Sequence, residues 1–570
     1  MSFLIFLAVF LFFMKADFSF ACMTILVGKK ASESGEILVG HNEDAPGRFV
    51  MQTHLVKKER RKPGTKIKFE PDLSEVELFN TRNNLFWSEA KTFNEDFSAS
   101  AFCDFFVNGY GVVICSNNCK FSKEDSPELF NGGIGYGFRR LIAEKSHCAK
   151  EAVDIACNLI EKYGYSSSGR SYAFSDKDEI FVLQVVNGKH YAVSRVPDDE
   201  VAVIPNHYTI RESEKNSRGY KELINYAVKR GWYKEGEIFD FSKVYQADDS
   251  FGLEKNTFRH VKAFEILLNM DLDELLKTQW QSLPFSIKPA QKVNIDTLKK
   301  ILREHHNSHF EKPISICNCD TLESNIVQIR YNPERIILRR ALGRPCNSVY
   351  IPWYFGITAI PEDYEDINGE KALSEHFRNN PDDMNYKNNA WFRAMELQAA
   401  CDILGDEKVH DEIKKLESKF ERELKTLDSQ LELRFKNKPD IAHAMIDGIV
   451  RSFTDEVKEF TLRMKKSLNI FNGEAENSVI PGKNFNVRIP KFINSNEIDI
   501  SKCKCGTSYT DKNDWSKCIE INPHDDYLTL VFETGKWVEN AVPCFTDLYI
   551  TLSDLSGKIF AGSVKISVRS

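Results

Sequence analysis

The N-terminal segment fixes where the folded part of this chain can begin. Residues 3–14 form an uninterrupted apolar run, FLIFLAVFLFFM. That run is shorter than the roughly 20 residues that a helix needs to cross a bilayer. Small residues, Ser19 and Ala21, stand three and one positions before Cys22, which is typical of the cleavage site of a secretory signal. We therefore expect a signal peptide over 1–21, cleavage between Ala21 and Cys22, and an exported mature chain.

A cysteine directly after a leader has two chemical interpretations. In a bacterial lipoprotein the thiol is acylated, but that signal prefers Leu three residues upstream and a small residue two upstream, where this chain has Ser19 and Phe20. In the other interpretation Cys22 is a nucleophile whose own α-amino group, with a pKa of about 8, accepts the thiol proton. An uncleaved anchor is the third alternative.

The residues after Cys22 predict a β-hairpin. Residues 23–27 and 37–40 have strand composition, and turn-forming residues at 32–35 separate them. The hairpin would bring the segment 41–44 back beside Cys22. We expect a carboxylate in that segment to hold the α-ammonium group, as a third group orients the base of a catalytic triad.

Composition and charge exclude several broad classes of protein. The chain has 570 residues, 42% of them hydrophobic, which excludes a mainly disordered protein and predicts several domains. A net charge of −7 argues against a nucleic-acid partner. No stretch after the leader is long and apolar enough to predict a membrane span.

An ordered series of sequence motifs follows the leader. They are CMTILVGKKASESGEILVGHNED (22–44), GYGVVICSNNC (109–119), GGIGYGFRRLIAEKSHCAKEAVDIACNLIEKYG (132–164), AVIPNHYTIRE (202–212), SICNCDTLESNIVQIR (315–330) and ALGRPCNSVYIPWYFGITAIPEDY (341–364). In this order they resemble the dipeptidase A–secernin family of cysteine N-terminal-nucleophile (Ntn) hydrolases, which is distantly related to bile-salt hydrolases and penicillin V acylases. The resemblance extends over most of the mature chain.

This resemblance implies a nucleophile and the groups that activate it. Cys22 matches the nucleophile, and Asp44 matches the orienting carboxylate. His41 stands where the wider group has an Arg, so that role does not transfer directly; neutral His brings no permanent charge. Arg259 matches a later Arg, which would stabilise the thiolate.

The resemblance also implies two oxyanion-binding asparagines. Asn118 matches the first, with neighbouring Asn117 as the alternative if the register shifts by one residue. Asn206 matches the second. A side-chain amide at such a position donates to the oxyanion of the tetrahedral intermediate, an interaction whose loss typically costs about 3 kcal/mol.

The fold that the resemblance implies is an α+β, four-layer αββα sandwich over 22–370, in which two sheets pack face to face under helices. Within it, hydrophobic periodicity predicts a helix over 138–163. Strands are predicted around 172–174 and 179–186.

Two further segments follow the core. Residues 371–475 are expected to be a helical segment packed on the core, with long helices over 410–435 and 441–468. A coiled-coil partner site there is the alternative, although no strict heptad is present. Residues 483–570 carry short alternating runs, which predict a small C-terminal β-sandwich-like domain.

The cysteines leave disulfides and zinc as alternatives. The chain has 14 Cys, and export makes disulfides the default. Cys503, Cys505 and Cys518 with His524 also fit four zinc ligands, but their spacing is not that of a standard zinc ribbon, so a bridge is favoured.

The same choice arises for Cys317 and Cys319, where export again favours a bridge. The His305-His306 pair lacks a neighbouring carboxylate pattern and is expected at a helix end. The acyl transfer to water that the resemblance implies needs neither a metal ion nor an organic cofactor, so we expect neither.

The sequence thus predicts an exported cysteine-type dipeptidase that hydrolyses short peptides through a thioester acyl-enzyme. Such an enzyme must recognise a free substrate ammonium group, for which Glu43 and Asp104 are candidate carboxylates. One alternative is an amidase or acylase that cleaves N-acyl amides with the same catalytic set. Another is a non-catalytic, anchored binding protein. The sequence leaves the oligomeric state open.

Overall fold

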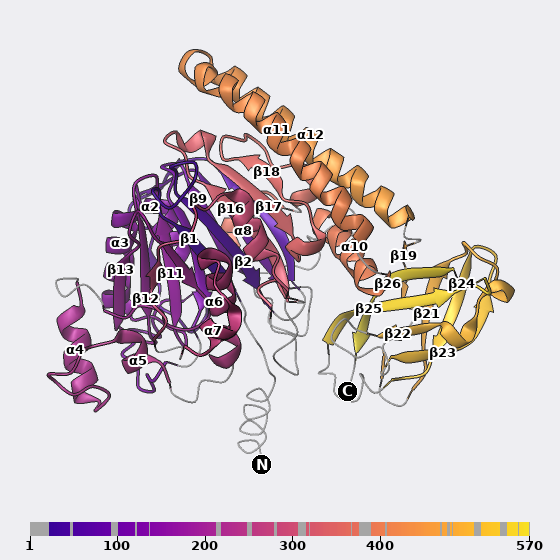
Figure 1. Ribbon diagram of the computed structural model, residues 1–570, viewed down its shortest axis with the longest axis horizontal. Coiled ribbons are helices and arrows are strands. Elements are labelled where there is room, and N and C mark those ends of the chain that lie inside the picture. The colour runs from indigo at the N-terminus through magenta and orange to yellow at the C-terminus, as the bar shows by residue number, and fades with distance from the viewer. Residues whose placement is uncertain are drawn as a thin grey trace.

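The computed structural model (Figure 1) consists of a large sheet-and-helix core, a long helical hairpin and a separate C-terminal sheet. It describes residues 22–568 except 46–48, 93–100, 120–121, 136, 213–217, 248–252, 279–281, 306–314, 319, 366, 376–388, 405–406, 468–469, 473, 476–478, 481–482, 507–514, 536–543 and 557.

The predicted hairpin is confirmed and lies in the middle of the first of two seven-stranded sheets. The first sheet consists, in spatial order, of β15 (Ser286–Ile287), β14 (Val201–Ile204), β1 (Met23–Val27), β2 (Leu38–Asp44), β16 (Thr321–Gln328), β17 (Ile337–Leu342) and β18 (Ile351–Tyr354). All its neighbouring strands are antiparallel.

The second sheet is also antiparallel. It consists, in spatial order, of β13 (Tyr191–Arg195), β12 (Ile180–Val185), β11 (Arg170–Ser175), β10 (Val113–Asn118), β9 (Ala101–Asn108), β8 (Leu85–Thr92) and β3 (Phe49–Val56). Strands β11 and β12 are those predicted around 172–174 and 179–186.

The inner faces of these two sheets share one hydrophobic core. Leu26 and Val39 of the first sheet belong to the same buried cluster as Phe86, Val113 and Val182 of the second. Because side chains alternate along a strand, the other face of each sheet must be covered separately.

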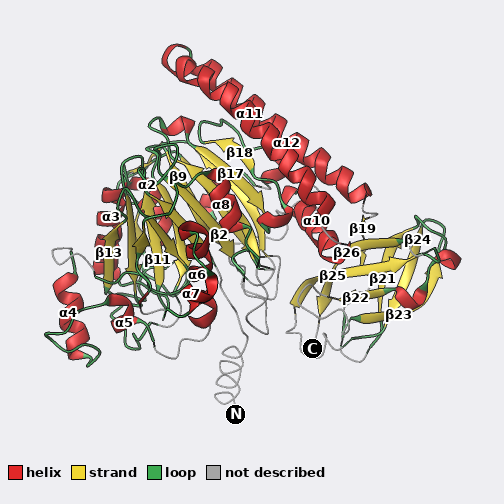
Figure 2. Cartoon of the chain, in the orientation of Figure 1, coloured by secondary structure: helices red, strands yellow, loops and turns green. Residues whose placement is uncertain are grey.

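Helices cover both outer faces. Helices α2 (Gly137–Lys145) and α3 (Ala149–Tyr163) pack on the second sheet, whereas α6 (Leu253–Leu268) and α8 (Ile295–Leu302) pack on the first. Figure 2 shows this arrangement of helices around strands.

The helix predicted over 138–163 is wrong in one respect, because it is divided between α2 and α3. The amide of Asn108 donates to the carbonyls of Ala143 (3.0 Å) and Ser146 (2.8 Å) at the end of α2. Cys148 then caps α3 by accepting the backbone N–H of Glu151. Hydrogen bonds from a distant strand therefore end the first helix.

The predicted helical segment contains α10 (Ala390–Leu404), α11 (Glu407–Asn437) and α12 (Pro439–Ser467). Helices α11 and α12 pair through the rings of Phe420 and Phe453, whose centroids are 4.2 Å apart. Both rings also belong to the core cluster shared by the two sheets, so the hairpin packs on the core.

The C-terminal residues form an eight-stranded sheet with its own hydrophobic core, seen at the yellow end of the chain in Figure 1. Its strands, in spatial order, are β19 (Ile470–Asn472), β26 (Ile559–Val568), β25 (Cys544–Ser553), β22 (Lys504–Gly506), β23 (Ser516–Pro523), β24 (Tyr527–Phe532), β21 (Phe485–Pro490) and β20 (Glu474–Ala475).

Shorter elements fill the connections. They are β4 (Glu59–Arg60), β5 (Lys66–Ile67), β6 (Val76–Glu77), β7 (Thr81–Arg82), α4 (Tyr220–Lys229), α5 (Phe241–Tyr245), α7 (Leu272–Leu276) and α9 (Gly369–Ser374). Within the described part of the chain, no helix has both the length and the apolar character needed to cross a bilayer.

Candidate active site

The thiol of Cys22 lies at the start of β1, facing the end of β2. Antiparallel pairing sets Met23 opposite Asn42, so the residues next to each of them are brought together. The Cys22 sulfur lies 3.4 Å from Glu43 Oε2 and 3.6 Å from the Asp44 carbonyl oxygen. Cys22 is 2% exposed, and it forms no disulfide with another cysteine whose side chain the structure describes.

Asp44 is a fully buried carboxylate at the end of β2. Its Oδ2 accepts a hydrogen bond from Asn318 Nδ2 at 2.7 Å, whereas its Oδ1 has no hydrogen-bond partner among the described residues. Burial raises the pKa of Asp44 to about 7, against the opposing charge of Arg259 and two side-chain hydrogen bonds. Among the described residues, the hydrogen bonding of this buried carboxylate is therefore incomplete.

Arg259, on α6, joins the backbone of Cys22 to Asn206. Its Nη1 donates to the Cys22 carbonyl at 3.3 Å, and its Nη2 donates to Asn206 Oδ1 at 2.9 Å. Nη2 also donates to Asn256, one helical turn earlier on α6. Burial lowers the pKa of Arg259, and the negative charges of Asp44 and Cys22 oppose that shift.

Asn206 links this group to Asn118 of the second sheet. Asn206 Nδ2 donates to the Asn118 carbonyl at 2.7 Å, and Asn118 Oδ1 is buried without a hydrogen-bond partner in the described structure. Asn117 is engaged differently: its Nδ2 donates to the Ile204 carbonyl at 3.0 Å and its Oδ1 accepts from Thr24 Oγ1 at 2.6 Å. Asn117 thus cross-links the two sheets, which favours Asn118 over Asn117 as the residue available to a ligand.

His41 lies beside Glu43 and next to Thr24. The Thr24 hydroxyl has one proton, which it donates to Asn117, so His41 Nδ1 at 2.7 Å must donate to Thr24 Oγ1. His41 Nε2 lies 3.4 Å from Glu43 Oε2.

Arg170, at the start of β11, brings a second positive charge that the sequence analysis did not identify. It pairs with Asn118 across β10 and β11, and its Nη1 donates to Ser116 Oγ at 3.1 Å. Although burial acts to lower it, the pKa of Arg170 is raised by two tyrosine hydroxyls and by the negative charges of Glu43 and Cys22. Only the pairing register of β10 and β11 reveals that Arg170 lies opposite Asn118, and the sequence alone does not give that register.

The structure thus brings together all six residues of the predicted catalytic set, Cys22, His41, Asp44, Asn118, Asn206 and Arg259, and adds Glu43 and Arg170. Of the two carboxylates considered for a substrate ammonium group, Glu43 contacts the thiol, whereas the side chain of Asp104 lies outside the described residues.

The remaining cysteines do not form disulfides among the described residues. The eleven cysteines whose side chains are described, which include Cys317, Cys503, Cys505 and Cys518, form no disulfides with one another. Cys319 lies outside the described residues. The predicted bridges stay predictions for the exported protein.

Comparison with known proteins gives the family. The model of peptidase family C69 matches residues 21–382. The chain is 23% identical over 386 residues to a probable dipeptidase of Latilactobacillus sakei, which covers 63% of this chain and 79% of that protein. It is 25% identical over 370 residues to a probable dipeptidase of Salmonella dublin, with 59% and 81% covered. A dipeptidase of Bifidobacterium longum is 26% identical over 412 residues, with 63% and 75% covered.

Among solved structures, domains 1-6 of the surface layer protein SbsC align with 31% of this chain and 29% of that chain, at 11% identity and a TM-score of 0.12, which is too low to bear on the fold. The match to the family model extends over more than half of the sequence and contains every residue of the candidate site. The chain belongs to peptidase family C69, and is a cysteine-type hydrolase that acts on peptide bonds.

Proposed function

We propose that this protein is an exported dipeptidase whose mature N-terminal residue, Cys22, is the nucleophile. The similar proteins of Latilactobacillus sakei, Salmonella dublin and Bifidobacterium longum are named as dipeptidases or probable dipeptidases. The observation that carries the proposal is the incomplete hydrogen bonding of Asp44 beside Cys22. Cleavage after Ala21 would create an α-ammonium group, which is the partner that a buried carboxylate oxygen lacks.

The first half of the reaction forms a thioester. The α-amine of Cys22 takes the thiol proton, and the sulfur attacks the carbonyl carbon of the scissile peptide bond. Asn206 has a second amide proton to donate to the oxyanion, because its first is used by the Asn118 carbonyl. The intermediate collapses when the α-ammonium protonates the leaving nitrogen, which releases the C-terminal amino acid.

The second half releases the N-terminal amino acid. Water loses a proton to the α-amine and attacks the thioester, and the thiolate leaves and is reprotonated. Arg259 holds the Cys22 carbonyl and the Asn206 side chain in position throughout. Arg170 supplies the permanent positive charge near the thiol that His41 does not.

We assign recognition of the substrate ammonium group to Glu43. In a dipeptide the α-ammonium nitrogen is separated from the attacked carbonyl carbon by a single Cα atom. A carboxylate that recognises it must therefore lie close to the nucleophile, and Glu43 Oε2 is 3.4 Å from the Cys22 sulfur. An N-acyl amide has no such ammonium group, so this contact favours the dipeptidase over the acylase alternative.

The packing supports a finer description of the fold as part of the same proposal. Two sheets with a shared core and helices on both outer faces would constitute the four-layer αββα sandwich of Ntn hydrolases over 22–370. The segments 371–475 and 483–570 would then be additions to that catalytic core.

The test compares two substrate panels on the exported protein. Free dipeptides should be hydrolysed, whereas N-acyl amides of the same residues should not. Activity on the acyl amides alone would contradict the dipeptidase assignment and favour an acylase. A protein with no activity on either panel and an acylated Cys22 would instead be an anchored binding protein.

A further inference from the structure

Three side chains of metal-ligating type, none of them in the predicted catalytic set, converge near the end of α8. His305 follows the end of α8, Cys317 lies in the loop before β16, and Cys346 lies in the 3-10 helix η3 (Pro345–Asn347). Their three ligand atoms, one imidazole nitrogen and two sulfurs, all lie within 4.8 Å of one another. Donors around a tetrahedral zinc ion are about 3.5–4 Å apart, given metal–ligand distances of about 2.0–2.3 Å.

Backbone contacts hold the three donor residues together. The N–H of Cys317 donates to the carbonyl of Glu304, the residue before His305, at 3.0 Å. The Nε of Arg303 donates to the carbonyl of Pro345, the residue before Cys346, at 2.7 Å. Cys317 and the residue before Cys346 are therefore both bonded to the residues that follow α8, so the fold itself positions the group.

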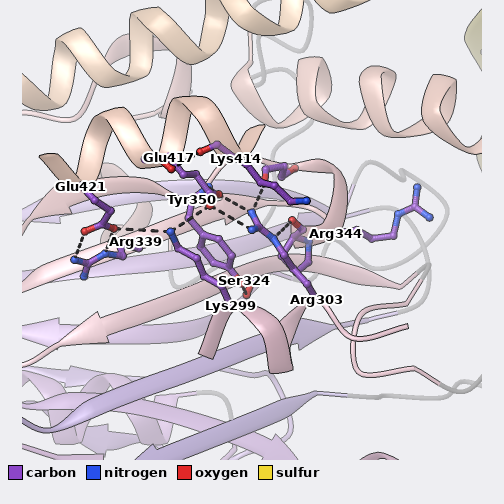
Figure 3. Close-up of polar contacts among 12 residues, drawn as sticks. Lys299, Arg303, Ser324, Arg339, Arg344, Tyr350, Lys414, Glu417 and Glu421 are labelled. Carbon is purple, nitrogen blue, oxygen red and sulfur yellow. Dashed lines mark hydrogen bonds and ion pairs between the residues drawn. The ribbon is translucent and has the colours of Figure 1, made fainter. Parts of the chain in front are cut away.

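Figure 3 shows the polar cluster that secures Arg303 in this role. Its Nη2 donates to the Ser348 carbonyl at 3.0 Å and contacts Glu417 of α11, whose carboxylate also pairs with Lys299 of α8 at 3.2 Å. Helix α8, the η3 turn and α11 are thereby joined next to the three donors.

The donor set fits a borderline-soft divalent cation. Two thiolates and one imidazole are ligands that select zinc, and a site with three protein ligands keeps a fourth position for water. Both thiols are free, and the side chain of His305 is exposed, so the group is open to an ion from solvent. A disulfide between the two sulfurs would account for Cys317 and Cys346, but it would leave the placement of His305 without a reason.

We propose that His305, Cys317 and Cys346 bind one zinc-class divalent cation, with water in the fourth position. This site departs from the expectation of a metal-free protein. That expectation rested on the implied acyl-transfer chemistry, and it weighed Cys317 with Cys319 and His305 with His306 as separate pairs, without Cys346.

The proposed metal site lies next to a residue that hydrogen-bonds to the carboxylate of Asp44. Asn318, directly after Cys317, donates to Asp44 Oδ2 at 2.7 Å. Asn42, two residues before Asp44, donates to the carbonyls of Leu302 (3.0 Å) and Ile316 (3.2 Å), on either side of the site. The ion would therefore hold the loop that carries Asn318, which makes its ligands positioning residues. This consequence rests on the proposed function, whereas metal binding itself does not.

The experiment measures metal content in the full chain purified without chelators. Elemental analysis should find about one more zinc equivalent in the wild type than in Cys346→Ser or His305→Ala. Cys148→Ser is the matched control. Serine keeps the helix cap that this half-buried cysteine provides, and the metal content should not change. His305→Ala alters an exposed side chain, and circular dichroism checks that both variants are folded.

Cobalt provides a second readout that does not depend on activity. Apo protein titrated with Co²⁺ should show the thiolate charge-transfer and tetrahedral d–d absorption bands, and Cys346→Ser should lose them. Equal zinc content and equal cobalt spectra in the wild type and in folded Cys346→Ser would overturn the proposal. So would peptide mapping that finds a Cys317–Cys346 disulfide in the protein as exported.

Discussion

Asp44 and Arg259 both contact Cys22, each from a different element, and the charge of each influences the pKa of the other. Asp44 reaches Cys22 through β2, and its carbonyl oxygen is 3.6 Å from the sulfur. Arg259 reaches it from α6 and donates to the Cys22 carbonyl at 3.3 Å. The residue that bears the thiol thus contacts the backbone of Asp44 and the buried guanidinium of Arg259.

Replacing the nucleophile should abolish turnover without unfolding the protein. Cys22→Ala removes only the sulfur, so hydrolysis of a good dipeptide should fall by at least about 1000-fold. Its melting temperature should stay close to that of the wild type. Cys148→Ser, at the cap of α3, should keep full activity. Near-normal rates for Cys22→Ala would show that another residue is the nucleophile.

Replacing Asn117, on β10, and replacing Asn206, in the loop after β14, should have different effects on activity and stability. Asn206→Ala removes a donor to the oxyanion and should lower kcat by about 100- to 1000-fold with little change in KM. Asn117→Ala breaks the link between Thr24 and the Ile204 carbonyl, so it should lower the melting temperature more than kcat. Steady-state kinetics and thermal unfolding of both variants separate these effects, and the reverse pattern would exchange their roles.

Loss of Arg259 should change the pH profile as well as the rate. Without its guanidinium the thiolate loses a nearby cation, so Arg259→Ala should shift the acid limb of kcat/KM to higher pH. It also leaves Asn206 Oδ1 and the Cys22 carbonyl without their donor, and a fall of about 100-fold in kcat/KM is expected. Arg259→Lys should recover part of the rate. An unchanged pH profile would restrict Arg259 to a structural role.

Substrate selection should depend on Glu43. Glu43→Gln keeps the shape of the side chain but removes the negative charge next to the thiol. The KM for free dipeptides should rise by about 10- to 100-fold, which corresponds to the loss of one charge-assisted hydrogen bond. N-acetylated dipeptides lack the ammonium group, so the difference in kcat/KM between free and N-acetylated dipeptides should disappear in Glu43→Gln. If the ratio of kcat/KM between the two substrates is unchanged, another carboxylate binds the ammonium group.

The stability of the uncleaved chain should depend on pH through Asp44. Its pKa is about 7 in the folded chain, above about 4 in an unfolded one. Between these values the folded state binds more protons at this site than the unfolded state does, so stability falls as pH rises. Asp44→Asn removes this effect and should raise the melting temperature at pH 8 far more than at pH 4. The same shift at both pH values would contradict the raised pKa.

The part of the site that lies within short sequence motifs was predictable. The hairpin after Cys22 follows from local strand and turn composition, and it places Asp44 beside the thiol. Asn206 and Arg259 came from motifs, and the structure joins them by a hydrogen bond of 2.9 Å.

Features that depend on pairing between distant strands were not predictable. Arg170 enters the site because it lies opposite Asn118 in the second sheet. Helix α2 ends before the predicted position because the side-chain amide of Asn108, on β9, donates hydrogen bonds to the carbonyls at its end. Cys346 joins His305 and Cys317 only through the fold. In each case the contact that matters joins residues far apart in the sequence, and no local sequence pattern indicates that they will meet.

The most direct test of this account is the intact mass and N-terminal sequence of the exported protein. We predict a chain that begins at Cys22 with an unmodified α-amino group and a free thiol, and that hydrolyses dipeptides. An N-terminus at any other residue, or an acylated Cys22 in an active enzyme, would contradict the proposal that one residue supplies both nucleophile and base.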